Sequence, residues 1–201
     1  MGLFTAKSDP GSDSRITVVS GLPRSGTSMV MKMLEAGGLM PLTDEIRQAD
    51  TDNPRGYYEF EPVKKLETDQ SWLPQAKGKA VKIISMLLRY LPPNYAYKVI
   101  FIRRHIPEVL ASQKQMLVRR GEPADQVSDE EMARIYDNHL RQTETWLNTR
   151  PDFDVLYINH RDIIDNPAGS CKKINKFLGG RLDVKQMTGV VDNALYRQRR
   201  K

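Results

Sequence analysis

A segment near the N-terminus combines two glycines, an arginine and three hydroxyl-bearing residues at a spacing that suits anion binding. It reads Gly21-Leu22-Pro23-Arg24-Ser25-Gly26-Thr27-Ser28, and its glycines have the spacing of a phosphate-binding P-loop. Thr27 stands where an ATP- or GTP-hydrolysing protein has the lysine that reaches the β- and γ-phosphates. Arg24 restores a cation, and its planar guanidinium can bind two oxygens of one anionic group. The pattern therefore predicts an anion cradle made of main-chain N–H groups, a guanidinium and hydroxyl groups.

The sequence on either side of this segment indicates that a strand leads into it and a helix leaves it. Ile16–Val19 is a β-branched run typical of a buried strand. Met29–Ala36 has apolar residues at helical spacing and stops at Gly37 and Gly38. In that order, the N–H groups of residues 24–28 lie at a helix N-terminus, where the helix dipole favours negative charge. An incidental strand-to-helix turn is the alternative, and the flanking patterns make it the weaker one.

Strand and helix patterns alternate along the rest of the chain. The further elements expected are buried strands at residues 80–85, 99–102 and 154–158, and helices at residues 107–120, 128–147 and 170–178, the second of which starts with the capping pair Ser128 and Glu131. This alternation predicts an α/β fold of three layers, in which helices cover both faces of a central, mostly parallel sheet in a P-loop-like architecture. In such sheets the ligand site lies at the carboxyl ends of the strands. At 201 residues the chain fits one domain, expected over residues 15–201 after a flexible tail of residues 1–14.

The loop resembles the 5′-phosphosulfate loop of the sulfotransferases that use 3′-phosphoadenosine-5′-phosphosulfate (PAPS). That loop commonly reads Pro, then Lys or Arg, Ser or Thr, Gly, and two more Ser or Thr residues, and residues 23–28 follow it at each position. The arginine form is similar to the loop of tyrosylprotein sulfotransferases and of many bacterial sulfotransferase-like proteins. The resemblance implies a sulfotransferase with PAPS as co-substrate, and it implies that Arg24 contacts the sulfate and the bridging phosphate. It places the PAPS contacts of the loop on Pro23, Arg24, Ser25, Gly26, Thr27 and Ser28.

Two further features fit the same resemblance. PAPS carries a separate 3′-phosphate, which the family binds with an Arg at a strand end and a Ser eight residues later; Arg104 and Ser112 have this interval, although the usual Pro two residues after the Arg is displaced to Pro107. Lys82, inside an apolar run, resembles the strand lysine that approaches the transferred sulfate, and a charge in such a run needs a reason. The alternatives are a capping charge and a surface serine at 104 and 112, and a lysine that snorkels from a strand end at 82.

The C-terminal part of the chain also resembles the family. Residues 156–162 and 176–179 are similar to its later motif, and the alignment puts His160 in the place of an aromatic residue near the adenine. The end of the chain is similar to the ends of bacterial relatives, which implies that Arg197 or Arg199 closes over the nucleotide. A solvated basic tail is the alternative.

Sulfuryl transfer needs positive charge near the leaving oxygen and a base for the proton of the acceptor, here expected to be a hydroxyl or an amine. We expect Arg24 and Lys82 to hold the sulfuryl group, without a metal ion. Glu59 is the first candidate for the base, because the aromatic residues on either side of it can desolvate it. Asp44 and Glu45 remain alternatives, and Glu45 with the Arg two residues on resembles a Glu-x-Arg pair of tyrosylprotein sulfotransferases.

Composition narrows the possible partners of the protein and the cellular compartment that we expect for it. The net charge of +6 favours an anionic ligand, but the sequence has no zinc-ligand spacing, RNA-binding aromatic signature or basic recognition helix, so no nucleic acid is expected. No apolar run approaches the roughly 20 residues that cross a bilayer, no signal peptide is indicated, and the single Cys171 favours a reducing cytoplasm. The acceptor stays open among small alcohols, carbohydrates, lipids and peptides, and so does the oligomeric state.

Two other functions stay open at this point. A nucleotide-triphosphate kinase or NTPase would depend on Mg²⁺ and would need a Lys after Gly26, which the sequence lacks. A non-catalytic module would keep the anion cradle and bind PAPS or its product, 3′,5′-ADP (PAP), without transferring anything.

Overall fold

The centre of the fold is a sheet of four parallel strands. In this computed structural model, which describes residues 14–44, 46, 56–124 and 126–191, the strand order is β2 (Ala80–Lys82), β1 (Ile16–Gly21), β3 (Tyr97–Arg103) and β4 (Phe153–Asn159). Val19 of β1 lies in register with Lys82 on one side and Ile100 on the other. Because all four strands run the same way, their carboxyl ends meet at one edge of the sheet, as the ligand site of such a fold requires.

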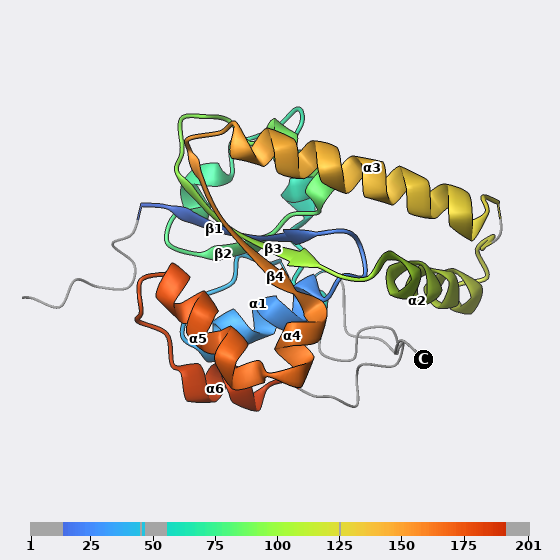
Figure 1. The fold of residues 1–201 in the computed structure, drawn as a ribbon. Helices are drawn as coiled ribbons and strands as arrows, with labels where there is room; N and C mark the ends of the chain where they lie inside the picture. Colours follow the sequence, from blue (N-terminus) through green and yellow to red (C-terminus); the bar gives the residue numbers. More distant parts are fainter. Residues whose placement is uncertain (1–13, 45, 47–55, 125, 192–201) are drawn as a thin grey trace, which may run out of the picture.

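The predicted α/β fold, with helices on both faces of a parallel sheet, is confirmed (Figure 1). The strands expected near residues 16, 99 and 154 are β1, β3 and β4. The strand expected over residues 80–85 is shorter, because β2 ends at Lys82 and Ser85 begins the 3₁₀-helix η4 (Ser85–Tyr90). Ile83 still donates its N–H to the Val19 carbonyl at 3.1 Å, and the chain then turns so that Leu88 of η4 is fully buried in the core.

Four helices cover one face of the sheet (Figure 1): α1 (Thr27–Ala36), α4 (His160–Asp165), α5 (Pro167–Phe177) and α6 (Val184–Gly189). They bury one apolar cluster against the strands, whose fully buried members include Val19, Val30, Met31, Leu34, Ile163, Cys171 and Ile174. The buried side of α1 fixes the direction of that helix. Its N-terminus, which follows the predicted anion loop, is therefore held at the carboxyl edge of the sheet.

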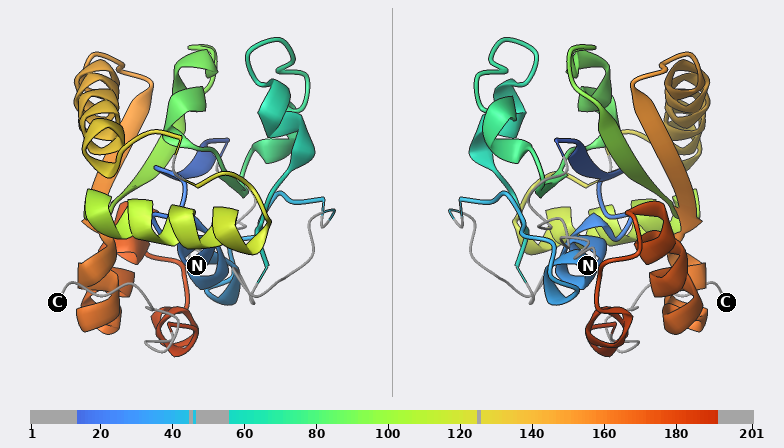
Figure 2. Two further views of the ribbon diagram at one scale, coloured as in Figure 1. Left: turned by 90° about the vertical axis from the view of Figure 1, so that its right-hand side faces the viewer. Right: turned by 90° about the vertical axis from the view of Figure 1, so that its left-hand side faces the viewer.

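The opposite face carries α3 (Asp129–Asn148) and the 3₁₀-helices η2 (Glu61–Lys65), η3 (Leu73–Ala76) and η4, as the side views in Figure 2 show. The predicted capping of α3 is confirmed, since the Ser128 hydroxyl accepts the Glu131 N–H at 3.2 Å. Aromatic rings fill much of this core, and Tyr97 stacks on Phe153 with ring centroids 4.8 Å apart.

Helix α2 (Ile106–Arg119) begins one residue before Pro107, which suits the first turn of a helix. It packs against α3 through a third, smaller cluster that also contains Leu22 of the anion loop, together with Val109, Leu110 and Tyr136. The pair of helices therefore supports the loop from outside the sheet.

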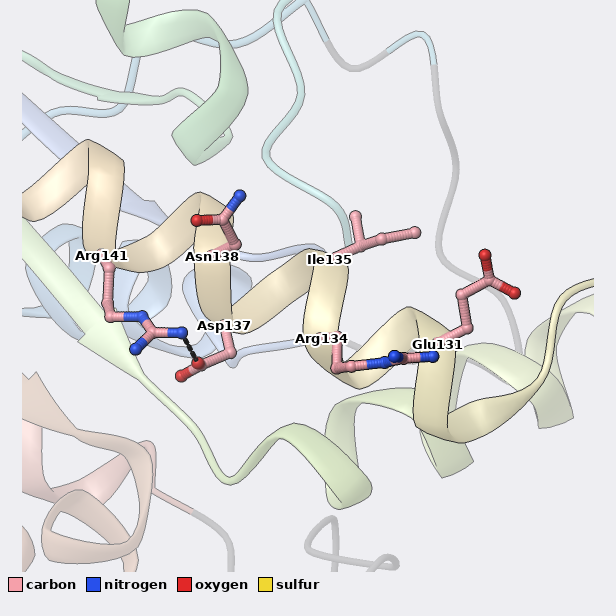
Figure 3. Close-up of a pocket in the computed structure, with 6 residues that line it drawn as sticks. All are labelled: Glu131, Arg134, Ile135, Asp137, Asn138 and Arg141. Carbon is pink, nitrogen blue, oxygen red and sulfur yellow. Dashed lines mark ion pairs between the residues drawn. The ribbon is translucent and has the colours of Figure 1, made fainter.

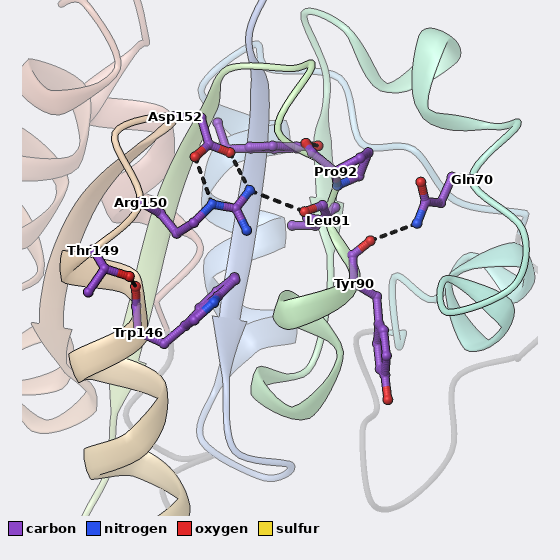
Figure 4. Close-up of polar contacts among 9 residues, drawn as sticks. Gln70, Tyr90, Leu91, Pro92, Trp146, Thr149, Arg150 and Asp152 are labelled. Atoms are coloured by element: carbon purple, nitrogen blue, oxygen red, sulfur yellow. Dashed lines mark hydrogen bonds and ion pairs between the residues drawn. The ribbon is translucent and has the colours of Figure 1, made fainter.

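The C-terminal end of α3 is anchored by Arg150 at the amino edge of the sheet, opposite the predicted site (Figure 4). Its guanidinium binds Asp152 at 2.8 and 2.5 Å and the Leu91 carbonyl at 3.3 Å, and it lies 5.0 Å from the ring centroid of Trp146. The hydrogen bond from Arg150 lowers the pKa of Asp152. These contacts join the end of α3 to the loops that precede β3 and β4.

Residues 40–42 run along the outer edge of β2. Ala80 donates its N–H to the Met40 carbonyl at 2.9 Å and accepts the Leu42 N–H at 2.7 Å, and Pro41 pairs with Ala80 as a parallel bridge. Within the described ranges, no helix is long and apolar enough to cross a membrane.

Candidate active site

The loop between β1 and α1 makes the tight turn that an anion cradle needs. Gly26 is the N-cap of α1 with a φ of 99°, and Arg24 has a φ of 67°. Both values lie in the left-handed region, which glycine adopts readily and an arginine rarely does. A Cβ on Gly26 would also lie 2.5 Å from Cδ2 of His160, so the position has no room for a side chain. N–H groups in turns of this kind, at a helix N-terminus, form concavities that bind anions.

Ser25 is used inside this turn. Its N–H donates to the Leu22 carbonyl at 3.2 Å, and the residue is 1% exposed. A Cβ on Gly21 would lie 2.5 Å from the Ser25 hydroxyl oxygen, so this oxygen lies beneath the turn. It has no hydrogen-bond partner among the described residues. The ligand contact expected of Ser25 stays a prediction, and the role visible here is to close the turn.

The two predicted anion sites meet through Arg24. Its Nε donates to the hydroxyl of Ser112 on α2 at 3.0 Å, while its carbonyl accepts Nη1 of Arg104 at 2.8 Å. Arg104 also donates Nε to Glu108 at 3.1 Å, and the side chains of this ion pair are only 10% and 9% exposed. The strand-end arginine thus supports the unusual backbone conformation at Arg24. The sequence indicated Arg24 and Arg104 as anion-binding residues, but it did not indicate the hydrogen bond from the Arg104 guanidinium to the Arg24 carbonyl.

Lys82 lies at the same edge, on the side of the sheet that α1 covers. Its side chain is 10% exposed, and its Nζ donates to the Tyr57 carbonyl and lies 3.6 Å from Oε1 of Glu59. The Tyr57 carbonyl also accepts the hydroxyl of Ser28, in the first turn of α1, at 3.1 Å. The first candidate base therefore stands beside the lysine expected at the sulfuryl group. Its catalytic role stays a prediction.

The alternative bases are placed differently. Asp44 accepts the N–H of Ile46 at 3.1 Å and that of Glu61 at 2.5 Å, so its carboxylate caps the start of η2 and holds the loop. Glu45 lies outside the described residues, as does Arg197, which was expected to close over the nucleotide.

His160, the first residue of α4, packs against the loop between β1 and α1. It is 6% exposed, and its ring lies against Gly26. Burial, and next the positive charge of Arg104, lower its pKa to about 3. The imidazole is therefore neutral at physiological pH. In this conformation it contacts the loop and presents little surface on which an adenine could stack.

A second histidine lies near the end of β2. His139 of α3 has its Nε2 2.8 Å from the hydroxyl of the buried Ser85, three residues beyond Lys82. Burial, and next the charge of Arg89, lower the pKa of His139. A neutral imidazole can accept a proton, so this residue is a further candidate for acid–base chemistry that the sequence reasoning missed. The four-residue spacing from His139 to Thr143, whose hydroxyl lies 3.4 Å from the same nitrogen, places both on one face of α3.

The exposed side of α3 has a shallow hollow that lies apart from these residues (Figure 3). All its lining side chains come from this one helix, and Arg141 pairs there with Asp137 at 2.6 Å. In the part of the chain that the structure describes, no three His, Cys, Asp or Glu side chains gather as a metal site.

Comparison with known proteins bears on the family and the fold of the chain. Residues 14–201 match the family described as sulfotransferase domain. Among solved structures, the sulfotransferase domain of the Synechococcus PCC 7002 olefin synthase has a TM-score of 0.57 at 16% identity, with 92% of this chain and 80% of that chain covered. The sulfotransferase domain of the curacin biosynthetic pathway has a TM-score of 0.56 at 14% identity, with 89% and 78% covered. Mouse sulfotransferase SULT7A1, complexed with PAP, has a TM-score of 0.55 at 19% identity, with 90% and 64% covered. No curated protein matches the sequence.

We expect Gly26→Ala to destabilise the protein more than Gly38→Ala. The φ angles at the two positions are 99° and 96°, so an alanine is strained by about 1–2 kcal/mol at each. Only at position 26 would the methyl group meet His160, since nothing lies within 4 Å of a Cβ at Gly38. Overpacking of this kind adds about 1–3 kcal/mol. Urea unfolding measures both losses, and equal values would contradict the contact.

The free energy of unfolding should rise with pH between about 5 and 7 because of His160. Its pKa is about 3 in the folded protein and about 6.5 in an unfolded chain, so between these values the unfolded state binds more protons. Stability therefore increases as pH rises, by about 2 kcal/mol from pH 5 to 7 for this side chain. Urea unfolding of His160→Gln should lack this part of the pH dependence, whereas His105→Gln, at an exposed histidine, should keep it. If His160→Gln retained the full dependence, the histidine would not be held neutral by burial.

Proposed function

Because the chain belongs to the sulfotransferase domain family, we propose that it transfers a sulfuryl group from PAPS to a hydroxyl or amine of an acceptor. The observation that carries the proposal is the connected set of contacts at the carboxyl edge of the sheet. It links the loop of residues 21–28 to Arg104 and Ser112 on one side and to Lys82 and Glu59 on the other. This set supplies donors for two separate anionic groups and a carboxylate next to one of them.

The residues fit the two anionic parts of PAPS. The left-handed turn at Arg24 and Gly26, at the start of α1, suits the phosphosulfate. Arg104 and Ser112 suit the 3′-phosphate. A guanidinium has five N–H donors, and those of Arg104 include a donor to Glu108 and one to the Arg24 carbonyl. The hydroxyl oxygen of Ser112 accepts from Arg24, so this contact does not use its own O–H, which can donate to a phosphate oxygen.

Lys82, Arg24 and Glu59 have separate tasks in the proposed reaction. PAPS would supply a sulfuryl group attached to a good leaving group, just as ATP supplies a phosphoryl group in phosphoryl transfer. Lys82 and Arg24 hold positive charge where the leaving oxygen becomes negative. Glu59 accepts the proton of the acceptor as the new S–O or S–N bond forms and the S–O bond to the phosphate breaks, which releases 3′,5′-ADP. The chain offers no lysine after Gly26 for a kinase mechanism.

Calorimetric titration tests the two-phosphate arrangement without an acceptor. We expect 3′,5′-ADP to bind at least about tenfold more tightly than 5′-AMP, because a charge-assisted contact to a second phosphate is worth at least about 1.5 kcal/mol. In Ser112→Ala the affinity for 3′,5′-ADP should fall towards that for 5′-AMP, which should itself change little. A matched control is Ser71→Ala, at an exposed serine away from the loop.

Two outcomes of that titration would count against the proposal. Equal affinities for 3′,5′-ADP and 5′-AMP would remove the second phosphate site. A tighter, Mg²⁺-dependent affinity for ATP would favour the kinase function instead.

We expect Glu59→Gln to lower turnover about 100-fold or more, because removal of a general base costs about 10²–10⁴ in rate. The assay measures release of 3′,5′-ADP from PAPS with a panel of alcohols, amines, carbohydrates and peptides. The affinity for 3′,5′-ADP should stay within about twofold of the wild type, since Gln keeps the size of the side chain. Glu61→Gln is the control, because Glu61 is exposed and pairs with Lys64.

The same assay separates the remaining candidates for the base. Unchanged turnover in Glu59→Gln would move the role to another residue, and His139→Gln and Asp44→Asn would then be measured in turn. Binding of 3′,5′-ADP with no transfer to any acceptor, in the wild type, would instead favour a non-catalytic binding module.

A further inference from the structure

One main-chain oxygen lies at the centre of the candidate active site. The Tyr57 carbonyl accepts hydrogen bonds from the Ser28 hydroxyl, at 3.1 Å, and from Lys82 Nζ. The two donors come from different elements, the start of α1 and the end of β2. They are also donors that the proposed function assigns to PAPS. A carbonyl oxygen, with its partial negative charge, is thus bound where an oxygen of the phosphosulfate would be bound.

The backbone around this carbonyl is bent and held on both sides. Gly56 has a φ of 84° and Tyr58 a φ of 51°, which is unusual for a residue with a bulky side chain. The Tyr58 hydroxyl donates to Glu35 of α1 at 2.5 Å. The Glu59 carbonyl accepts the hydroxyl of Thr43 at 2.8 Å and the N–H of Asp44 at 3.4 Å. Residues 56–60 are therefore fastened to α1 and to the segment after α1 while the carbonyl points at Lys82.

The contacts of Ser28 and Lys82 cannot stay as they are when an anion arrives. Ser28 has a single O–H donor, so it can serve the Tyr57 carbonyl or a ligand oxygen, but not both. Lys82 has three donors, but a sulfuryl oxygen beside it would meet the Tyr57 carbonyl and the Glu59 carboxylate, 3.6 Å from Nζ. Oxygen atoms that carry negative charge repel one another at such distances. Relief requires the segment that carries both oxygens to move.

We propose that the Tyr57 carbonyl stands in for a sulfuryl oxygen, and that donor binding displaces residues 56–60 and so repositions Glu59. This inference rests on the proposed function. Tyr57 is a positioning residue, because it acts through Lys82 and Glu59. When a sulfuryl oxygen takes the place of the Tyr57 carbonyl, Glu59 is released from Lys82. The base is therefore available only when the donor is bound. The donor should therefore bind before the acceptor.

Hydrogen–deuterium exchange of the whole protein tests the displacement without any acceptor. With saturating PAPS, amides in peptides that cover residues 56–63 should exchange at least about fivefold faster than in the ligand-free protein, since the Phe60 carbonyl accepts the Val63 N–H at 2.9 Å and Asp44 accepts the Glu61 N–H. With saturating 3′,5′-ADP, which has no sulfuryl group, the rates should stay at the ligand-free level.

A variant that loosens the segment gives an independent result. Tyr58→Phe removes the bond to Glu35, so residues 56–63 should exchange faster even without ligand, and PAPS should bind about two- to tenfold more tightly because less has to be displaced. Tyr90→Phe is the control: Tyr90 engages Gln70 through its carbonyl, as Figure 4 shows, and both measurements should stay at the wild-type values.

Calorimetry on the same samples separates this inference from the proposed function. If PAPS does not bind, the proposed function fails. If PAPS binds and residues 56–63 keep their ligand-free exchange rates, the displacement is overturned while the function stands. If 3′,5′-ADP accelerates exchange as much as PAPS does, the sulfuryl oxygen is not the trigger, and the inference is overturned as well.

Discussion

Buried positive charge at the carboxyl edge of the sheet is the constraint on which the rest of the site depends. Lys82 and Arg104 each expose only 10% of their side chains, and a buried cation is costly unless oxygen atoms surround it. The chain meets this need with carboxylates and also with two main-chain carbonyls, that of Tyr57 for Lys82 and that of Arg24 for Arg104. The same contacts set the shape of the two loops that carry these carbonyls, so the charge of the site and its backbone geometry are coupled.

The two layers of helices keep this arrangement in place from opposite directions. On one face, His160 fills the space under Gly26, and the buried side of α1 directs the helix N-terminus towards the ligand edge. Beyond the edge of the sheet, α2 and α3 enclose Leu22. The loop can therefore hold left-handed backbone at Arg24, since the neighbours on each side leave it little room to relax. The loop of residues 21–28 is thus held in place, whereas the proposed displacement concerns residues 56–60.

Much of the fold was predictable because it rests on local patterns. The β-branched run at 16–19, the capping pair at 128 and 131 and the glycines at helix ends each have a direct physical meaning. The loop was predictable for the same reason, as its residue types and spacing suit anions. The partners of the cations were not, because a main-chain carbonyl such as that of Tyr57 has no signature in the sequence. The inward position of Ser25 and the early end of β2 likewise follow from tertiary packing.

The short strand β2 has a consequence for how the protein behaves among copies of itself. A strand at the border of a sheet exposes main-chain groups that can recruit a strand from another molecule and start aggregation. Here residues 40–42 already take up both hydrogen-bonding groups of Ala80. Such a cover works against intermolecular strand addition on this border, close to the segment of residues 56–60 that donor binding is proposed to displace.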